Sequence, residues 1–231
     1  WDVTVAKAGL YKINIAYYPM AGKGSEIERR LEIDGQLPFV EAGSLVFDRI
    51  WKNNGTVQKD AAGNDIRPDQ IEAPEWMNTD CKDGSGLYND PFLFYFSSGI
   101  HRIRLVSVKE PMAIAQILLH NTGELPSLDR LKTQYQEKGY QSADETVRVQ
   151  AEDTESKSSP SIYAEFDRGS AGMEPYSADV IRLNKISANK FQLPGQWIKW
   201  KLKVAKAGLY KAVVRYKQDG RDGAFTSRRL L

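Results

Sequence analysis

The chain has 231 residues, of which 41% are hydrophobic and 27% are charged, an ordinary balance for a globular protein. Its 32 basic and 30 acidic residues give a net charge of +2 without long runs of one sign, which argues against a nucleic-acid-binding surface. A single cysteine, Cys81, excludes an internal disulfide and a multi-cysteine metal site, and no stretch approaches the roughly 18 apolar residues of a membrane-spanning helix.

Strand signals dominate the first forty residues. On both sides of Ala8-Gly9, residues 3–18 show a period of two and are rich in β-branched and aromatic side chains. This pattern is typical of two strands joined by a turn. Asp34-Gly35 stands between apolar residues and favours a tight type I′ turn, because both central positions of that turn need positive φ. The sequence therefore predicts a meander of hairpins.

The middle of the chain has the weakest pattern. Residues 47–51 indicate a short strand, whereas residues 52–90 are rich in Asn, Asp, Gly and Pro and predict long loops. Strands return over residues 92–108, which contain three phenylalanines of one parity, namely Phe92, Phe94 and Phe96. Residues 113–120 predict a further, buried strand.

A helix interrupts this pattern only once. Residues 124–140 have helical spacing of apolar side chains, with Ser127 as the N-cap and Gly139 as the stop signal. Beyond it, strand chemistry resumes in four segments, at residues 147–153, 162–166, 180–183 and 197–203. Low helix content and many short strands predict an all-β protein, an antiparallel β-sandwich with one linker helix.

The octapeptide VAKAGLYK occurs twice, at residues 5–12 and 204–211. An offset of 199 also places Trp1 on Trp200 and Tyr17 on Tyr216 without a gap. Because this period is far longer than the units of a solenoid, it indicates two copies of a whole domain. We expect neither copy to be complete.

The order of the motifs resembles that of galactose-binding-like β-sandwiches, the carbohydrate-binding modules of families 6 and 35. The relevant strings are QAED, GQWIKWKLKVAKAGLYKAVVRY, RRLEIDGQLPF and SSGIHRIRLVSV. This resemblance implies a jelly-roll sandwich. The longer strings IERRLEIDGQLPF and IRLVSVKEPM resemble tandem modules in large extracellular solute-binding lipoproteins of Gram-positive sugar ABC transporters. That resemblance implies an extracellular or cell-surface location and contact with a transporter permease through the parent protein.

On this pattern, residues 1–123 correspond to the C-terminal two-thirds of a first module, residues 124–146 to a linker with its helix, and residues 147–231 to the N-terminal half of a second copy. A partial sandwich exposes sheet edges. We therefore expect residues 147–199 to complement the first module, with residues 147–152 paired to residues 113–119.

Aromatic residues in the long loops provide the candidate carbohydrate site. An aromatic ring can lie against the apolar face of a pyranose while polar groups bond its hydroxyls. The predicted binding residues are Trp51, Trp76, Tyr88 and Asp48. An equally weighted interpretation is that these aromatic side chains fix the loops to the sandwich.

The resemblance also implies a structural calcium ion at the first strand of the module, where the family often offers two acidic residues. Here they correspond to Gln150 and Glu152, and the loss of one acid weakens the expected site. The alternative is that Glu152 only ends a strand. No other cofactor is expected.

Three functions remain open from the sequence. The first is a non-catalytic carbohydrate-binding fragment whose partner is an oligosaccharide or polysaccharide. The alternative is a structural spacer or protein-docking sandwich, and a glycoside hydrolase fragment ranks third because nothing marks a pair of carboxylates converging on a cleft.

Overall fold

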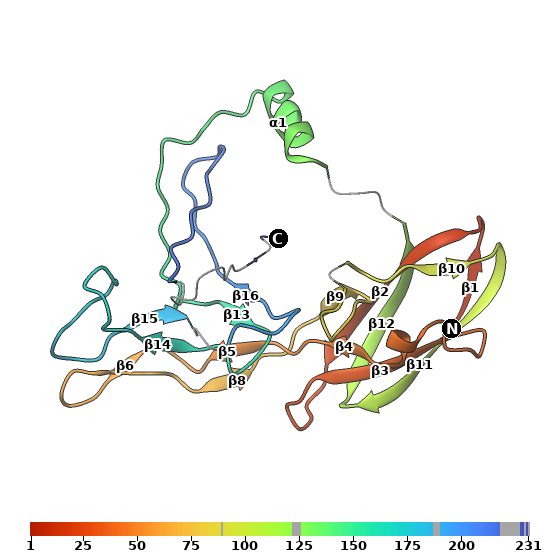
Figure 1. Ribbon diagram of the computed structural model, residues 1–231, viewed down its shortest axis with the longest axis horizontal. Coiled ribbons are helices and arrows are strands. Elements are labelled where there is room, and N and C mark those ends of the chain that lie inside the picture. Colours follow the sequence, from red (N-terminus) through yellow and green to blue (C-terminus); the bar gives the residue numbers. More distant parts are fainter. Residues whose placement is uncertain (89, 122–125, 187–189, 218–226, 229, 231) are drawn as a thin grey trace. The chain divides into compact units, whose positions relative to one another are not determined.

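The computed structural model describes residues 1–88, 90–121, 126–186, 190–217, 227, 228 and 230 (Figure 1). Two compact units divide the chain. Unit 1 comprises Trp1–Glu124 and Arg148–Lys203, and unit 2 comprises Leu125–Val147 and Val204–Leu231. No helix in the described ranges has the length and apolar character needed to cross a membrane.

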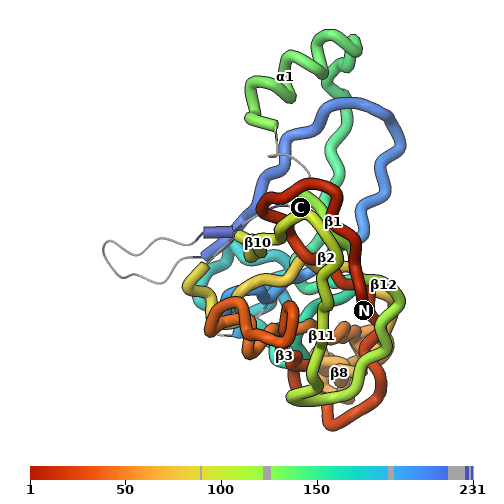
Figure 2. The backbone as a smooth tube through the Cα atoms, turned by 90° about the vertical axis from the view of Figure 1, so that its right-hand side faces the viewer, coloured from red at the N-terminus to blue at the C-terminus, as the bar shows by residue number. Residues whose placement is uncertain are grey.

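Two antiparallel sheets form the sandwich of unit 1. The first has the strand order β1-β11-β3-β4, and the second has the order β10-β2-β12, with β9 also paired to β2. In the first sheet the bounds are β1 Asp2–Val5, β3 Ile27–Ile33, β4 Leu45–Phe47 and β11 Gly99–Lys109. In the second sheet they are β2 Gly9–Pro19, β9 Met77–Asp80, β10 Phe94–Phe96 and β12 Met112–His120. Figure 2 shows β2 beside β12, its antiparallel partner.

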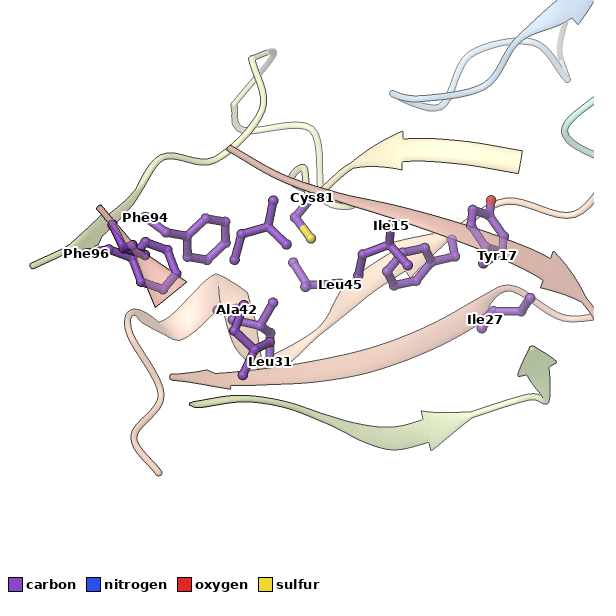
Figure 3. Packing of buried hydrophobic residues seen from close by; sticks show 13 residues of the cluster. Ile15, Tyr17, Ile27, Leu31, Ala42, Leu45, Cys81, Phe94 and Phe96 are labelled. Carbon is purple, nitrogen blue, oxygen red and sulfur yellow. The ribbon is translucent and has the colours of Figure 1, made fainter. Parts of the chain in front are cut away.

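The core lies between the inward faces of these two sheets (Figure 3). Alternate residues of the strands point into it, as the period of two predicts. Its fully buried members include Ile15, Tyr17, Leu31, Phe94 and Phe96. The expectation that phenylalanines around residue 94 share one face of a strand is therefore confirmed. Cys81 is buried in the same core.

The Asp34-Gly35 turn is also confirmed. Both residues have positive φ, 52° and 79°, and the backbones of Ile33 and Gln36 bond each other across the turn. The 3-10 helix η1 (Val40–Gly43) follows and packs on β3.

Smaller sheets complete unit 1. One four-stranded sheet has the order β16-β13-β5-β8, and the pairs β14-β15 and β6-β7 form two more. Their bounds are β5 Trp51–Asn53, β6 Gln58–Lys59, β7 Asp65–Ile66, β8 Gln70–Glu72, β13 Ser156–Lys157, β14 Ala164–Phe166, β15 Leu183–Ile186 and β16 Ile198–Lys199. The segment predicted as long loops thus contains five short strands, β5 to β9.

Unit 2 contains the predicted helix and the second octapeptide. Helix α1 spans Leu128–Glu137, its N-cap Ser127 accepts a hydrogen bond from the backbone of Arg130, and Gly139 follows with φ of 66°. The second octapeptide forms no strand there. A single bridge joins Leu209 to Ser142.

Several strand predictions need correction, among them those at residues 162–166 and 180–183, of which only Ala164–Phe166 and Leu183 belong to strands. Residues 147–153 form no strand, and the strand expected at residues 197–203 is limited to Ile198–Lys199. The strand over residues 113–120 exists as part of β12, but it is an edge strand with several exposed residues and is not buried. Residues 147–153 alternate like a strand but lack a neighbouring strand to pair with, whereas β12 pairs on one side only, with β2, and is therefore partly exposed.

The all-β antiparallel sandwich with one helix is therefore confirmed, and its jelly-roll connectivity stays a prediction, as do the module boundaries. Residues 148–203 do pack with residues 1–124 in one unit, but the expected pairing of residues 147–152 with β12 is absent. The strand contact is made instead between Lys157 of β13 and Trp51 of β5.

Candidate functional site

The outer face of the sheet formed by β9, β2 and β12 carries a row of exposed and half-buried polar and aromatic groups. Strand β2 alternates, so that Ile13, Ile15 and Tyr17 point into the core. The residues between them point outward, since successive side chains of a strand lie on opposite faces.

The register of the neighbouring strands builds a polar row along this outer face. Residues directly opposite each other in an antiparallel pair project to the same side. On β9, Asp80 faces Asn14 and Asn78 faces Ala16. On β12, the outward residues opposite Lys12, Asn14 and Ala16 are His120, Leu118 and Gln116.

An aromatic pair stands at one end of the row. Trp76, just before β9, has 57% of its surface exposed, and its ring centroid lies 5.5 Å from that of Tyr18 at an interplanar angle of 60°. The two rings form an angled pair rather than a flat platform. One ring can therefore stack on a ligand while the other flanks it.

A fixed carboxylate stands toward the other end. Asp80 Oδ1 accepts hydrogen bonds from Asn14 Nδ2 and His120 Nε2, both at 2.8 Å. Burial raises the pKa of Asp80, but these bonds and the charges of His120 and Lys12 outweigh it, so that the pKa lies below its ordinary value. The side chain is thus ionised at neutral pH and held by its neighbours. Among the described residues, no donor contacts Oδ2, which is left to accept a bond from a ligand.

The four residues predicted as the carbohydrate site do not come together. Only Trp76 lies on this face. Tyr88 is equally exposed, but it lies in another loop, with its ring beside Phe92. Trp51 belongs to β5 and is half-buried, with its ring over Gly24.

Asp48 has an internal structural role. Its Oδ2 accepts a bond from Trp197 Nε1 at 3.0 Å, and its backbone carbonyl accepts one from the Tyr17 hydroxyl. Burial raises the pKa of this carboxyl above its ordinary value. Asp48 therefore connects residues 148–203 to the sandwich instead of facing a ligand.

The residues expected to bind calcium do not form a ligand set. Glu152 is buried, its Oε2 has no hydrogen-bond partner among the described residues, and burial raises its pKa to about 7. Gln150 is half-buried. The described residues contain no group of three or more His, Cys, Asp or Glu side chains placed to hold a metal ion, whereas calcium takes six to eight oxygens.

A second polar cluster surrounds Arg49, which the sequence analysis did not identify. Its guanidinium is buried and bonds Glu72 and Glu110, each at 2.8 Å. Glu110 also accepts bonds from the Lys23 backbone and the Ser25 hydroxyl, and it lines an open depression of about 650 Å³. Because these groups are already paired with one another, this cluster stabilises the loops and offers little to a ligand.

Sequence reasoning missed most of the outer-face residues. Asn14 lies on the face of a predicted strand opposite to Ile13 and Ile15, and this alternation indicates an outward-facing polar side chain. Asn78 and Asp80, in contrast, belong to a segment whose Asn and Asp content indicated a loop. Only the pairing of β9 with β2 brings Asp80 beside Asn14, 66 residues away in the sequence, and Asn78 beside Ala16.

No protein-family model, no curated protein and no solved structure matches this chain. Its resemblance to carbohydrate-binding modules stays an expectation from the sequence.

Proposed function

We propose that the outer face of the β9-β2-β12 sheet binds an oligosaccharide or polysaccharide without catalysing a reaction. The observation that carries this proposal is the exposed Trp76 beside Tyr18, at the end of a row of amide and carboxylate groups. The proposal also takes up the expected extracellular or cell-surface setting of the sugar-transport modules that the sequence resembles.

The chemistry of the face fits a sugar. An aromatic ring stacks against the apolar CH side of a pyranose, while amides and carboxylates bond its hydroxyl groups. From Tyr18 to Asn14 the strand rises by roughly 14 Å, at about 3.4 Å per residue. This length accommodates a ligand longer than one sugar ring, with its stacked end at Trp76 and its hydroxyl groups near Asp80.

The composition of the face supports the non-catalytic part of this proposal. Glycoside hydrolysis generally needs two carboxyl groups on either side of the scissile bond. Among the described outward-facing residues of β2, β9 and β12, only Asp80 carries a carboxyl group.

A glycan-array screen of the whole chain tests the proposal, with and without calcium because Glu152 and Gln150 are predicted ligands. We expect binding that Trp76→Ala reduces at least tenfold and that Asp80→Asn weakens. Tyr88→Ala is a matched control, because Tyr88 has the same exposed fraction and lies in another loop. Loss of binding in Tyr88→Ala alone would move the site to that loop.

Absence of binding to every glycan by the folded chain would overturn the proposal in favour of the spacer or protein-docking role.

A further inference from the structure

We propose that His101 is a pH-dependent latch between two turns of unit 1. As an imidazolium it ties the turn after β3 to the turn between β10 and β11, and its deprotonation releases the second of these turns. The proposal does not depend on sugar binding, because none of its groups lies on the β9-β2-β12 face.

The imidazole of His101 lies between two acceptors. Nδ1 lies 2.7 Å from Oδ2 of Asp34, which follows β3, and Nε2 lies 3.0 Å from the backbone carbonyl oxygen of Ser97, which follows β10. A carbonyl oxygen and an ionised carboxylate accept hydrogen bonds and donate none. A neutral imidazole has one N–H and can bond only one of them, whereas an imidazolium has two. The geometry therefore selects the charged form of the ring.

The carboxylate that faces the ring is held in its ionised form. Asp34 Oδ1 accepts the backbone N–H of Arg102 at 2.8 Å, and this bond, together with the bond from His101, holds the pKa of Asp34 below its ordinary value. In turn, the bonds to Asp34 and to the Ser97 carbonyl raise the pKa of His101 above its ordinary value of 6.5. Both directions describe a charged pair at neutral pH.

The other charged groups on the neighbouring strands already have partners. The guanidinium of Arg102, on β11, bonds the carboxylate of Asp2, on β1, with 2.7 Å between Nε and Oδ1. The ammonium group of Trp1 donates to the Ile103 carbonyl at 2.8 Å. Among the described residues, Asp34 is therefore the carboxylate that contacts the imidazole and the group whose charge controls its protonation.

Deprotonation changes one side of the latch. Nδ1 keeps the remaining proton, because its bond to the ionised Asp34 is the shorter one and is assisted by charge. Nε2 then directs a lone pair at the Ser97 carbonyl, so that this bond is lost, and the Ser97 hydroxyl, 3.2 Å away, is the nearby group that can donate instead. Water has little access to the imidazole, which is 12% exposed and packs against the buried ring of Phe96.

The raised pKa of His101 fixes the sign of the pH dependence. The folded chain holds this proton more tightly than the unfolded chain, so the stabilisation is complete below pH 6.5 and is lost as the pH rises through the folded pKa. We therefore expect the turn at residues 97–99 to be fixed at mildly acidic pH and released at higher pH.

An NMR titration of the whole chain tests the latch, with long-range proton–nitrogen spectra of the imidazole rings. The chain has two histidines, and His101→Gln identifies the signals of the latch. We expect both ring nitrogens of His101 to carry a proton at pH 6.5, with a pKa above that value. The backbone amide signals of Ser98 and Gly99 should shift with the same midpoint.

Two matched variants separate the charge of Asp34 from its place in the turn. Asp34→Asn keeps the turn, because Asn-Gly also adopts the two positive φ angles of type I′, and it should lower the pKa of His101 to 6.5 or below. The midpoint of the turn signals should fall with it. Asp69→Asn removes the same charge from an exposed position before β8 and should leave the pKa unchanged.

Three results would overturn the proposal: a wild-type His101 pKa at or below 6.5, the same pKa in the wild type and in Asp34→Asn, or turn signals that do not titrate with His101. The first result would assign His101 as a neutral ring that accepts the Ser97 hydroxyl proton.

Discussion

Lys157 shows how one buried charge limits the stability of unit 1. Its side chain is completely buried in β13, where Nζ donates to Asn53 Oδ1 at 2.9 Å, and burial lowers its pKa from 10.5 to about 8. Between pH 8 and 10.5 the unfolded chain therefore binds more protons than the folded chain at this site. Stability contributed by this group must rise with pH over that window.

Lys157→Met tests this directly. Removing the charge should raise the free energy of unfolding at pH 7 by about 1 to 3 kcal/mol, because the cost of burying the ammonium group disappears. Asn53 Oδ1 keeps the bond from Gln70 Nε2. Urea denaturation from pH 7 to 10 should show a difference between variant and wild type that shrinks as pH rises. A constant difference would contradict the proposed cause, and Lys7→Met, at an exposed position, is the control.

Arg49 has the opposite effect, because its charge is paired. Arg49→Met leaves the buried carboxylate of Glu110 without its cation and should lower the free energy of unfolding by roughly 3 to 5 kcal/mol. The double variant Arg49→Met, Glu110→Gln should recover part of that loss in the same urea measurement. Arg30→Met removes an exposed partner of Glu32 and should cost about 1 kcal/mol or less. Equal losses in Arg49→Met and Arg30→Met would refute the account.

The two copies of the repeated octapeptide adopt different secondary structure. In both copies the tyrosine hydroxyl bonds the carbonyl four residues earlier, Tyr11 to Lys7 at 2.6 Å and Tyr210 to Lys206 at 2.7 Å. The surroundings differ, because Glu145 Oε2 lies 2.6 Å from the Tyr210 hydroxyl and is a second acceptor for its one proton, whereas the first copy enters β2, which pairs with β10 and β12. The same eight residues thus keep one local bond and form a strand in one copy only.

The two equivalent glycines provide a matched test of this difference. A Cβ on Gly208 would lie 2.9 Å from Ala143 Cβ, whereas one on Gly9 would meet only Tyr11, at 3.9 Å. Gly208→Ala should therefore break the bonds between Leu209 and residues 141–143, and amide hydrogen exchange at Leu209 should become faster. Gly9→Ala should leave exchange in β2 almost unchanged. Similar effects in both variants would rule out a role for the local contact.

At the scale of the whole molecule, unit 1 is assembled from two stretches that residues 125–147 of unit 2 separate in the sequence. Several contacts join the stretches: Lys157 to Asn53, Trp197 to Asp48, and Arg182 to Asp65. These bonds are made by residues more than 100 positions apart. The chain between the two stretches is therefore not needed to hold them together.

A protease site inserted after Gly139 tests this arrangement. After cleavage, we expect residues 1–139 and 140–231 to elute together in size-exclusion chromatography under native conditions. Replacing Asp48 and Asp65 by alanine should weaken this association at least tenfold, because the Trp197 and Arg182 bonds are lost. Immediate separation of the fragments from the unmodified sequence would show that residues 148–203 do not pack on the sandwich.

The sequence alone determined the features that depend on neighbouring residues. The Asp34-Gly35 turn follows from the preference of Asp-Gly for the two positive φ angles that the turn needs. The helix after Ser127 follows from its N-cap residue and from the stop signal at Gly139. Buried Phe94 and Phe96 follow from strand parity. Each of these depends on conformational preferences within a few residues, so no distant partner was needed to predict them.

Only the tertiary structure decided which strand-like segments became strands and which polar residues gathered on one face. Residues 147–153 alternate like a strand but have no strand partner, whereas the Asn- and Asp-rich residues around Asp80 pair with β2. The backbone hydrogen bonds of a sheet join residues that are distant in sequence. Alternation along a strand determines which face of the sheet a side chain points to, but not which strand pairs beside it. The placement of Asn14, Asp80 and His120 beside one another was therefore beyond local patterns.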